Sequence, residues 1–495
     1  MGRWARAHVP ELCALGAGIL IRLSMALLYD ARIGFDFNAH WPHIQYIATR
    51  HALPPLDFNT TAPHPPLYHL IAAVVVGRGL DAGALGWMAA LWGMLRLGLV
   101  WVGLEKWLPE SRMARVVALA LAAVLPAAAH LDGMITNETL VMLMSAAVFV
   151  VAPSAISGAR TGRIGPMLAL GALLALALMS KVSASVLIVS IAIAIGLEIF
   201  RTRPPSAWGR ALRVRALPLI AGALVLAAVA GPWFVRNVAL YGKVAPSAYE
   251  GSLKPNQAPY EAMPYLDRRP IGFYLGWNLH VYVHPIYPTG IKPNARFFPV
   301  LLASTFNDYY VYSYSGGGRY RTDRSVSPAG VTLGCMSVMA GTAIALVTVI
   351  AWFAAVRALW RRREDGEPDP RFALLLAPLG ALIGQIHFAT KYPNDNFGPI
   401  KGAYLQFVAP VLCALFGVGV AWMWRRARGR GRWRWRWRVP ALVAIGCVGL
   451  VAAYSAHARF PRFGKDAYTA APFFAPSSPL PRPSSPLRPP SSPLR

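Results

Sequence analysis

Long apolar segments separated by short polar breaks run through most of the chain. Eleven of these segments have close to the length that an α-helix needs to cross a membrane. The predicted spans are residues 10–29, 84–104, 114–131, 138–153, 164–179, 182–200, 216–235, 331–356, 372–390, 402–424 and 439–456. Continuous apolar runs favour helices over the alternating strands of a membrane barrel. The pattern therefore predicts an all-α polytopic membrane protein with about eleven transmembrane helices.

One further apolar run, between Pro65 and Leu80, is too short to be a crossing. It ends at Arg78, whereas a transmembrane helix needs about 20 apolar residues. Basic residues precede the first span and occur again in the segment 105–115, so both positions are expected on the cytoplasmic side, with an even number of crossings between them. We therefore predict that 65–80 contains a juxtamembrane helix at the outer surface, within one external loop from residue 30 to residue 83.

The composition excludes a soluble enzyme. The 495 residues are 56% hydrophobic and 14% charged, whereas a soluble domain has about 25% charged residues. The formal net charge of +28 would fit a nucleic-acid partner in a soluble chain. Here, however, about half of the lysines and arginines lie in six short breaks between apolar segments, as expected of cytoplasmic loops. The distribution of charge thus indicates the membrane topology. The predicted partner is a lipid bilayer, and no nucleic-acid partner is expected.

The same alternation divides the chain into four regions. Residues 1–235 are expected to form a transmembrane core, 236–330 an external loop rich in aromatic residues, 331–456 the C-terminal transmembrane helices, and 457–495 an external tail. The tail is rich in proline and serine and lacks the apolar content to fold, so disorder is predicted. The sizeable loops without basic clusters all face the outer side, and any chemistry is expected there.

The first external loop carries a carboxylate and two imidazoles at helical spacing. The segment GFDFNAHWPHIQYI places Asp36, His40 and His43 at positions i, i+4 and i+7, which share one face of a helix. Such a group could provide a general base, could bind a divalent metal such as Mg²⁺ or Mn²⁺, or could be a solvated polar face. The spacing alone leaves these alternatives open.

Two further outer motifs lie close to predicted helix starts. The segment APHPPLYHLI places His64 and Tyr68 at the start of the short helix, where proline is favoured. The segment HLDGMITNETL places Asn137 and Glu138 at a membrane boundary. An ionisable residue is costly at such a boundary unless it is paired or functional. Glu138 is therefore a candidate for a functional site.

Together these residues resemble the GT-C superfamily of membrane-embedded glycosyltransferases, which use polyprenyl-phosphate sugars. The matching features are the acidic residue after the first span, the HPPLY helix, the Asn-Glu pair, Ser180 with Lys181, and PWFVRNVALYG at 232–242. Relatives in this superfamily include protein O-mannosyltransferases, the aminoarabinose transferase of lipid A and oligosaccharyltransferase catalytic subunits. The resemblance covers about residues 1–404 and implies that residues 1–235 form a GT-C-like catalytic core.

The resemblance implies a role for each matching position. Asp36 matches the carboxylate that faces the reaction centre and would be the general base for an acceptor hydroxyl; Asp57 is a second candidate for the base. Cations are needed to hold the donor phosphate. The cations expected there are Lys181, Arg236, Lys391 and Lys401. The residues expected to bind substrate are His64, Tyr68, Asn137 and Glu138.

Metal binding is the point at which the sequence departs from the family. The second-loop motif is often Asp-Asn-Glu, but here the triplet that ends at Glu138 is Thr-Asn-Glu. The first-loop motif is frequently Asp-Glu, but here Asp36 is followed by phenylalanine and asparagine. Both departures remove negative charge that could hold a metal. Asp36, His40 and His43 remain as a candidate ligand set.

The sequence thus predicts an inverting hexosyl- or pentosyltransferase. It would move a sugar from a polyprenyl-phosphate donor to a hydroxyl of a glycan, lipid or protein, at the periplasmic face of a bacterial cytoplasmic (inner) membrane. Two alternatives stay open. A transporter or flippase of lipid-linked saccharides would account for Arg22 and Arg96 within predicted spans, and a non-catalytic scaffold of a glycan-assembly complex would leave Asp36 dispensable.

Overall fold

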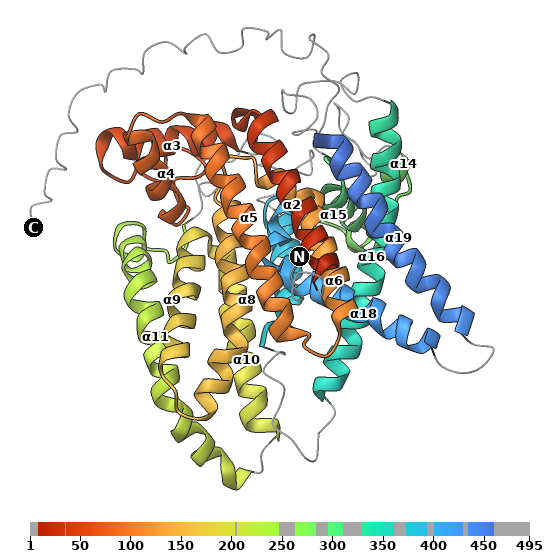
Figure 1. The fold of residues 1–495 in the computed structure, drawn as a ribbon. Helices are drawn as coiled ribbons and strands as arrows, with labels where there is room; N and C mark the ends of the chain where they lie inside the picture. Colours follow the sequence, from red (N-terminus) through yellow and green to blue (C-terminus); the bar gives the residue numbers. More distant parts are fainter. Residues whose placement is uncertain are drawn as a thin grey trace, which may run out of the picture. The chain divides into compact units, whose positions relative to one another are not determined.

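The computed structural model describes residues 8–34, 36–202, 205–246, 263–283, 296–309, 328–360, 373–393, 400–428 and 434–459. All regular secondary structure in this part of the chain is helical (Figure 1), which confirms the predicted all-α architecture. The α-helices are α2 (Val9–Leu28), α3 (Phe37–Arg50), α4 (Leu67–Gly77), α5 (Ala82–Trp107), α6 (Arg112–Val124), α7 (Pro126–Leu131), α8 (Glu138–Arg160), α9 (Gly165–Ser180), α10 (Ser185–Thr202), α11 (Pro205–Tyr241), α13 (Ile271–Leu275), α14 (His280–Val283), α15 (Phe297–Phe306), α16 (Pro328–Trp360), α17 (Ala377–Lys391), α18 (Ala409–Arg428) and α19 (Arg434–Arg459). The 3₁₀ helices are η1 (Ala31–Ile33), η2 (Val182–Ala184), η3 (Tyr265–Asp267) and η7 (Gly402–Val408).

Within the described residues, eight helical segments are long and apolar enough to cross a membrane, so the chain is a multi-pass membrane protein. They contain α2, α5, α8, α10, α11, α16, α18 and α19 and coincide with eight of the predicted spans. The other three predicted spans form shorter helices. α9 has 16 residues, α17 has 15, and the span 114–131 is divided between α6 and α7. Pro126 opens α7, and proline cannot donate the N–H bond that would continue α6.

Glycines allow the central helices to pack closely. α8 contacts α5 and α9, and α9 contacts α11. A Cβ atom on Gly103 of α5 would lie 2.3 Å from the ring of Phe149 on α8. A Cβ atom on Gly171 of α9 would lie 2.2 Å from the backbone of Gly222 on α11. Small residues at such contacts are typical of helix packing in membranes. The result is a well-packed centre from which α8 presents its first residue, Glu138.

The first external loop folds into a small core of its own. α3 and α4 pack on each other and lie together across one end of the long helices (Figure 1). Their shared apolar core includes Ile44 of α3, Tyr68 of α4 and Leu85 of α5. α4 begins directly after its N-cap residue, Pro66, so the short helix predicted within 65–80 is confirmed. Its place at the outer membrane surface stays a prediction.

The described parts of the region 236–330 contain several helices, whereas the sequence predicted an external loop there. α11 continues to Tyr241, and α13, α14 and α15 follow. α15 is packed into the main core through Phe297 and Val300, both fully buried. Residues 263–283 reach α17, where the hydroxyl of Tyr265 lies 2.8 Å from Nδ1 of His387. Almost all of the tail predicted at 457–495 lies outside the described residues, which end at residue 459.

Candidate functional site

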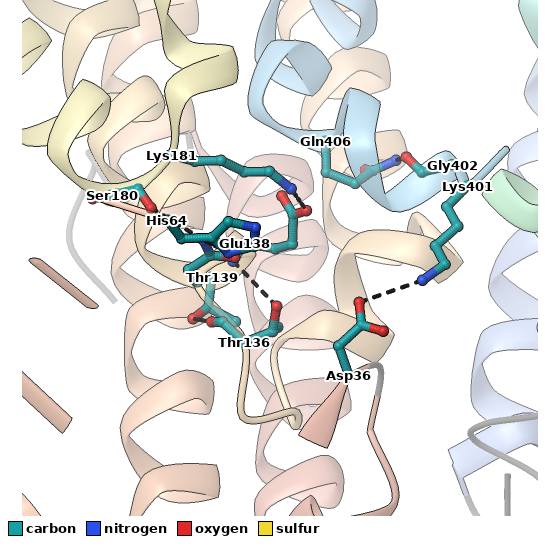
Figure 2. Close-up of polar contacts among 11 residues, drawn as sticks. Asp36, His64, Thr136, Glu138, Thr139, Ser180, Lys181, Lys401, Gly402 and Gln406 are labelled. Atoms are coloured by element: carbon teal, nitrogen blue, oxygen red, sulfur yellow. Dashed lines mark hydrogen bonds and ion pairs between the residues drawn. The ribbon is translucent and has the colours of Figure 1, made fainter. Parts of the chain in front are cut away.

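Asp36 precedes α3 in a backbone conformation that few residues adopt. Its φ of 57° lies in the left-handed region, which aspartate tolerates better than most non-glycine residues but which costs about 1–3 kcal/mol. The side chain is 48% exposed, and one carboxylate oxygen lies 3.4 Å from Nζ of the buried Lys401 (Figure 2). The proposed base therefore faces a buried cation while it remains open to solvent on one side.

The backbone next to Lys401 is fixed against α15. The N–H of Gly402 donates a hydrogen bond to Oγ of Ser304 at 2.8 Å. A Cβ atom on Gly402 would lie 2.3 Å from Oγ1 of Thr305, so a larger residue would push η7 away from α15. Nε2 of Gln406 also donates to the carbonyl oxygen of Gly402 at 2.8 Å. These contacts fix the start of η7 and with it the position of Lys401.

Glu138 and Lys181 form a second ion pair, in which both side chains are mostly buried (Figure 2). Glu138 is the first residue of α8, and its N–H donates to Oγ1 of Thr136 at 3.4 Å. The positive end of the helix dipole stabilises a carboxylate at this position. Lys181 directly follows α9 as its C-cap residue. The tight packing of α8 on α9 thus brings together two residues that are 43 positions apart.

Tyr404 connects the two ion pairs. Nζ of Lys181 lies 4.4 Å from the centroid of its ring, and Nζ of Lys401 lies 5.6 Å from it. A cation within about 6 Å of the face of an aromatic ring is attracted by the ring quadrupole. Two carboxylates and two ammonium groups therefore share one location. We call it the paired-lysine site, and its members are Asp36, Glu138, Lys181, Lys401 and Tyr404.

Asn137 links the paired-lysine site to the first external loop. Nδ2 of Asn137 donates to the carbonyl oxygen of Ser180 at 3.2 Å and lies 3.4 Å from Nδ1 of His64. His64 is also within the electrostatic reach of Lys181 and Asp36. Three of the four predicted substrate-binding residues, His64, Asn137 and Glu138, thus lie at or beside this site.

Buried histidines lie between α3 and α4, next to the site. Nδ1 of His40 is 3.0 Å from Nε2 of His69, and the rings of His43 and His69 stack with their centroids 3.8 Å apart. Burial lowers the pKa of His40 to about 3 and that of His43 to about 4, because a buried imidazolium is poorly solvated. These side chains are therefore neutral at pH 7. Tyr68, the fourth predicted substrate residue, packs with its ring 5.9 Å from that of His40 and is fully buried.

The arrangement gives no support to a metal site formed by Asp36, His40 and His43. Among the described residues, no group of three or more His, Cys, Asp or Glu side chains is placed to hold a metal ion. His40 and His43 do lie on one buried face of α3, where they contact His69 and Thr61. Asp36 lies before the first residue of the helix, so the helical spacing does not apply to it, and its carboxylate contacts Lys401 instead.

Two predicted phosphate-binding cations are not members of the paired-lysine site. The guanidinium of Arg236 on α11 lies over the rings of Trp233 and Tyr241, at 5.1 and 5.8 Å from their centroids. Nζ of Lys391, the last residue of α17, lies 5.3 Å from the ring centroid of Tyr392. Both cations stay proposals for binding the donor phosphate.

A small cavity of about 10 Å³, which is room for about one water molecule, adjoins the paired-lysine site. Lys401 is part of its wall, together with His130 at the end of α7 and Asn307 and Asp308 after α15. Amide, carboxylate and ammonium groups can accept hydrogen bonds from hydroxyl groups or donate to them. The cavity can therefore hold a water molecule beside the ammonium that pairs with Asp36.

Sequence reasoning missed Tyr404 as a member of the site, although a signal for it exists. Tyr404 follows Lys401 by three residues, and its N–H donates to the carbonyl oxygen of Lys401 at 3.1 Å. Lys401 directly precedes η7, and this i→i+3 bond closes the turn that brings the tyrosine close to the lysine. Recognition of the KGAY segment as such a turn would have indicated that Tyr404 lies near Lys401.

No protein-family profile and no curated protein matches the chain. Two solved proteins with a similar arrangement of helices are the oligosaccharyltransferase of Archaeoglobus fulgidus and ArnT of Cupriavidus metallidurans. In the apo form of each protein, the identity to this chain is 14% and the TM-score is 0.46. The match to the archaeal protein covers 90% of this chain and 56% of that protein. The match to ArnT covers 92% of this chain and 78% of ArnT. ArnT bound to undecaprenyl phosphate gives 15% identity and a TM-score of 0.42, over 93% of this chain and 76% of ArnT.

The chain is similar to these two proteins only at this low level. It spans little more than half the length of the archaeal oligosaccharyltransferase. The likeness concerns the arrangement of the helices, and the function proposed below rests on the residues of the chain itself.

Proposed function

We propose that this protein is an inverting glycosyltransferase that moves a sugar from a polyprenyl-phosphate donor to an acceptor hydroxyl. The observation that carries the proposal is the paired-lysine site, where the half-exposed carboxylate of Asp36 pairs with Lys401 and the ring of Tyr404 lies near both Lys401 and Lys181. Sugar transfer of this kind needs a base for the acceptor and positive charge for the departing phosphate. Asp36 supplies the first, and Lys181 and Lys401 supply the second.

In the proposed reaction, Asp36 accepts the proton of the acceptor hydroxyl while the acceptor oxygen forms a bond to the anomeric carbon of the donor sugar. The bond from this carbon to the phosphate oxygen breaks, and its electron pair leaves with the phosphate. Lys181 and Lys401 stabilise the negative charge that develops there. One displacement of this kind inverts the anomeric configuration.

Binding of the donor would also free the base. A phosphate placed between Lys181 and Lys401 competes with Glu138 for the first ammonium and with Asp36 for the second. Loss of its ion pair would make the Asp36 carboxylate a stronger base for the acceptor proton. His64 and Asn137, at the edge of the site, would contact the donor or the acceptor.

The proposed setting is the cytoplasmic membrane of a bacterium, with the site on the periplasmic face. α3 and α4, which lie at the end of the bundle beside the site (Figure 1), would then be the juxtamembrane helices of the first external loop. The acceptor would be a hydroxyl of a glycan, a lipid or a protein.

The test is transfer by the purified protein from polyprenyl-phosphate sugars, with the product configuration determined by NMR. Undecaprenyl phosphate, which is bound to ArnT in one of the solved structures, is the lipid carrier to test first. The expected product has the anomeric configuration opposite to that of the donor. A product with the donor's configuration would contradict the single displacement. Movement of the lipid-linked saccharide across vesicle membranes without transfer would favour the transporter, and neither activity would favour the scaffold.

A further inference from the structure

A triad of charged side chains lies inside the helix bundle, close to the paired-lysine site but separate from it. Oδ2 of Asp132 accepts hydrogen bonds from Nε of Arg22 at 2.8 Å and from Nη2 of Arg96 at 2.6 Å. The exposed fractions of the side chains are 0% for Arg22, 6% for Arg96 and 1% for Asp132. We call this group the Asp132 triad. Buried charges are costly in a membrane protein and are often kept for function.

The triad holds the start of a short segment that leads to the site. Asp132 follows α7, whereas Arg22 belongs to α2 and Arg96 to α5. Arg22 also donates through Nη1 to the backbone oxygens of Gly18 and Ala123, so its own position is fixed. Residues 132–137 then run from the triad to Glu138 at the start of α8.

The same segment supports the first external loop. Met134 and Ile135 are fully buried. A Cβ atom on Gly34 would lie 2.8 Å from Cβ of Met134, so the loop rests directly on the methionine. Gly34 is two residues before Asp36. One segment thus contacts the loop two residues before the base and also leads into the glutamate that pairs with Lys181.

Glycines allow Asp132 and the residue after it to pack closely against α5 and α2. A Cβ atom on Gly93 of α5 would lie 2.4 Å from Cγ of Asp132. A Cβ atom on Gly133 would lie 2.6 Å from Cε of Met25 on α2. Protein interiors packed this tightly transmit a shift rather than absorb it. A change at Asp132 should therefore displace the segment 132–137.

We propose that Arg22, Asp132 and Arg96 are positioning residues that hold the segment 132–137 as a common support for Asp36 and Glu138. The proposal rests on the proposed function, because it concerns the residues that would carry out the transfer. Displacement of the support should disturb both ion pairs of the paired-lysine site. The rate of the transfer step should then fall more than the affinity for the donor, since misplacement by about 1 Å is enough to lower a rate by about 100-fold.

The molecule contains a matched control at the other end of α8. Oε1 of Glu198 accepts hydrogen bonds from Nε of Arg160 at 2.8 Å and from Nη2 of Arg215 at 2.6 Å, and these three side chains are also buried. We call this group the Glu198 triad. Arg160 is the last of the 23 residues of α8 and Glu138 is the first. At 1.5 Å per residue the two lie about 33 Å apart.

The experiment compares Asp132→Asn with Glu198→Gln in the full-length protein. For Asp132→Asn we expect kcat to fall on the order of 100-fold with the donor KM nearly unchanged, and hydrogen exchange to increase in peptides covering 30–40 and 132–138. Glu198→Gln should leave both kcat and exchange at these peptides close to wild type. Equal effects of the two variants on kcat, or unchanged exchange near Asp36 in Asp132→Asn, would overturn the proposal. If the wild type transfers no sugar, the exchange measurement still tests the support while the proposed function fails.

A second pair of variants covers the case in which Asp132→Asn does not fold. Gly34→Ala adds one methyl group against Met134 and leaves the charges intact. Gly34→Ala should lower kcat and increase exchange around Asp36. Gly16→Ala on α2 is its matched control, because a Cβ atom there meets nothing within 4 Å, and it should leave both unchanged. Full activity of Gly34→Ala, or an equal loss in Gly16→Ala, would contradict a support that acts through this contact.

Discussion

The Asp132 triad and the Glu198 triad have the same chemistry at different places along the bundle. In each triad, one carboxylate oxygen accepts hydrogen bonds from two arginines, at 2.6 and 2.8 Å. No side chain of either triad is more than 9% exposed. The Glu198 triad joins α8, α10 and α11, far from the paired-lysine site. The Asp132 triad holds the segment that supports Asp36 and leads to Glu138. From this comparison we infer that the same kind of buried ion triad can hold helices together in one region and position a functional segment in another.

The ends of α8 differ in a second respect, since only one of them presents cations beside a half-exposed carboxylate. In the Glu198 triad the carboxylate is buried with its arginines. In the paired-lysine site Asp36 is 48% exposed and Lys181 is 19% exposed. The second arrangement is thus partly exposed, whereas the first is at most 9% exposed. The following predictions test this difference.

Among the variants that remove a cation, Lys401→Gln should have the largest effect on transfer. The variant removes an ammonium that stabilises the departing phosphate, and loss of one such electrostatic contact typically lowers kcat by about 100- to 1000-fold. Lys391→Gln is the comparison variant and should lose less activity, because Lys391 lies over Tyr392 outside the paired-lysine site. Steady-state kinetics of both variants would measure the effect. An equal loss of kcat in both variants would mean that Lys401 has no greater role in transfer than Lys391.

The two triads should contribute similarly to stability although they differ in function. Asp132→Asn and Glu198→Gln each leave two buried arginines without their carboxylate, which typically costs about 3–5 kcal/mol. Thermal or denaturant unfolding in detergent should therefore show comparable losses. A loss confined to Asp132→Asn would mean that the two triads are not equivalent, and the kinetic comparison between them would lose its control.

Acid should loosen the end of the molecule that holds α3 and α4 first. The folded pKa of His40 is about 3 and that of His43 about 4, both below the ordinary value of 6.5. The unfolded state therefore binds protons that the folded state does not. The free energy of unfolding is highest above pH 6.5 and falls as pH decreases toward 4, by about 1 kcal/mol per pH unit for each histidine.

Hydrogen exchange at pH 7, 6 and 5 would measure this loosening locally. Peptides from α3 and α4 should lose protection as the pH falls, whereas peptides around the Glu198 triad, which contains no histidine, should change less. Parallel changes in both regions would show that the buried histidines do not govern the acid response.

The smallest predicted effect concerns Tyr404. Its ring lies near the ammonium groups of Lys181 and Lys401, and a cation–π contact contributes about 0.5–2 kcal/mol. Tyr404→Leu should therefore lower kcat by a few-fold to about 30-fold, while Tyr404→Phe, which keeps the ring, should remain near wild type. A large loss in Tyr404→Phe would assign a role to the hydroxyl instead.

Helix positions could be predicted from the sequence because each depends on local chemistry. Runs of apolar residues mark the spans, and Pro66 marks the start of α4. The break between α6 and α7 was missed, although Pro126 was visible within the span. A hydropathy pattern averages over a window and so does not show a single proline that interrupts a helix.

The composition of the site was only partly predictable. Asp36 and Lys401 are 365 residues apart, and no periodicity can pair residues at that separation. The types of residue could be predicted from the chemistry, since a transfer from a lipid phosphate needs one base and several cations, and their roles stay a prediction. Which cations gather depends on helix packing, and packing leaves Arg236 against aromatic rings on α11. The pairing of Arg22 and Arg96 with Asp132 was likewise invisible in the sequence.

The most direct test of the central claim compares two carboxylates of the first external loop. Asp36 contacts Lys401, whereas Asp57 is an exposed residue between α3 and α4. Removal of a general base typically lowers the rate by about 100- to 10,000-fold, so transfer by purified Asp36→Asn should fall to this extent while Asp57→Asn keeps wild-type activity. Equal turnover of wild type and Asp36→Asn would contradict the assignment of Asp36 as the base.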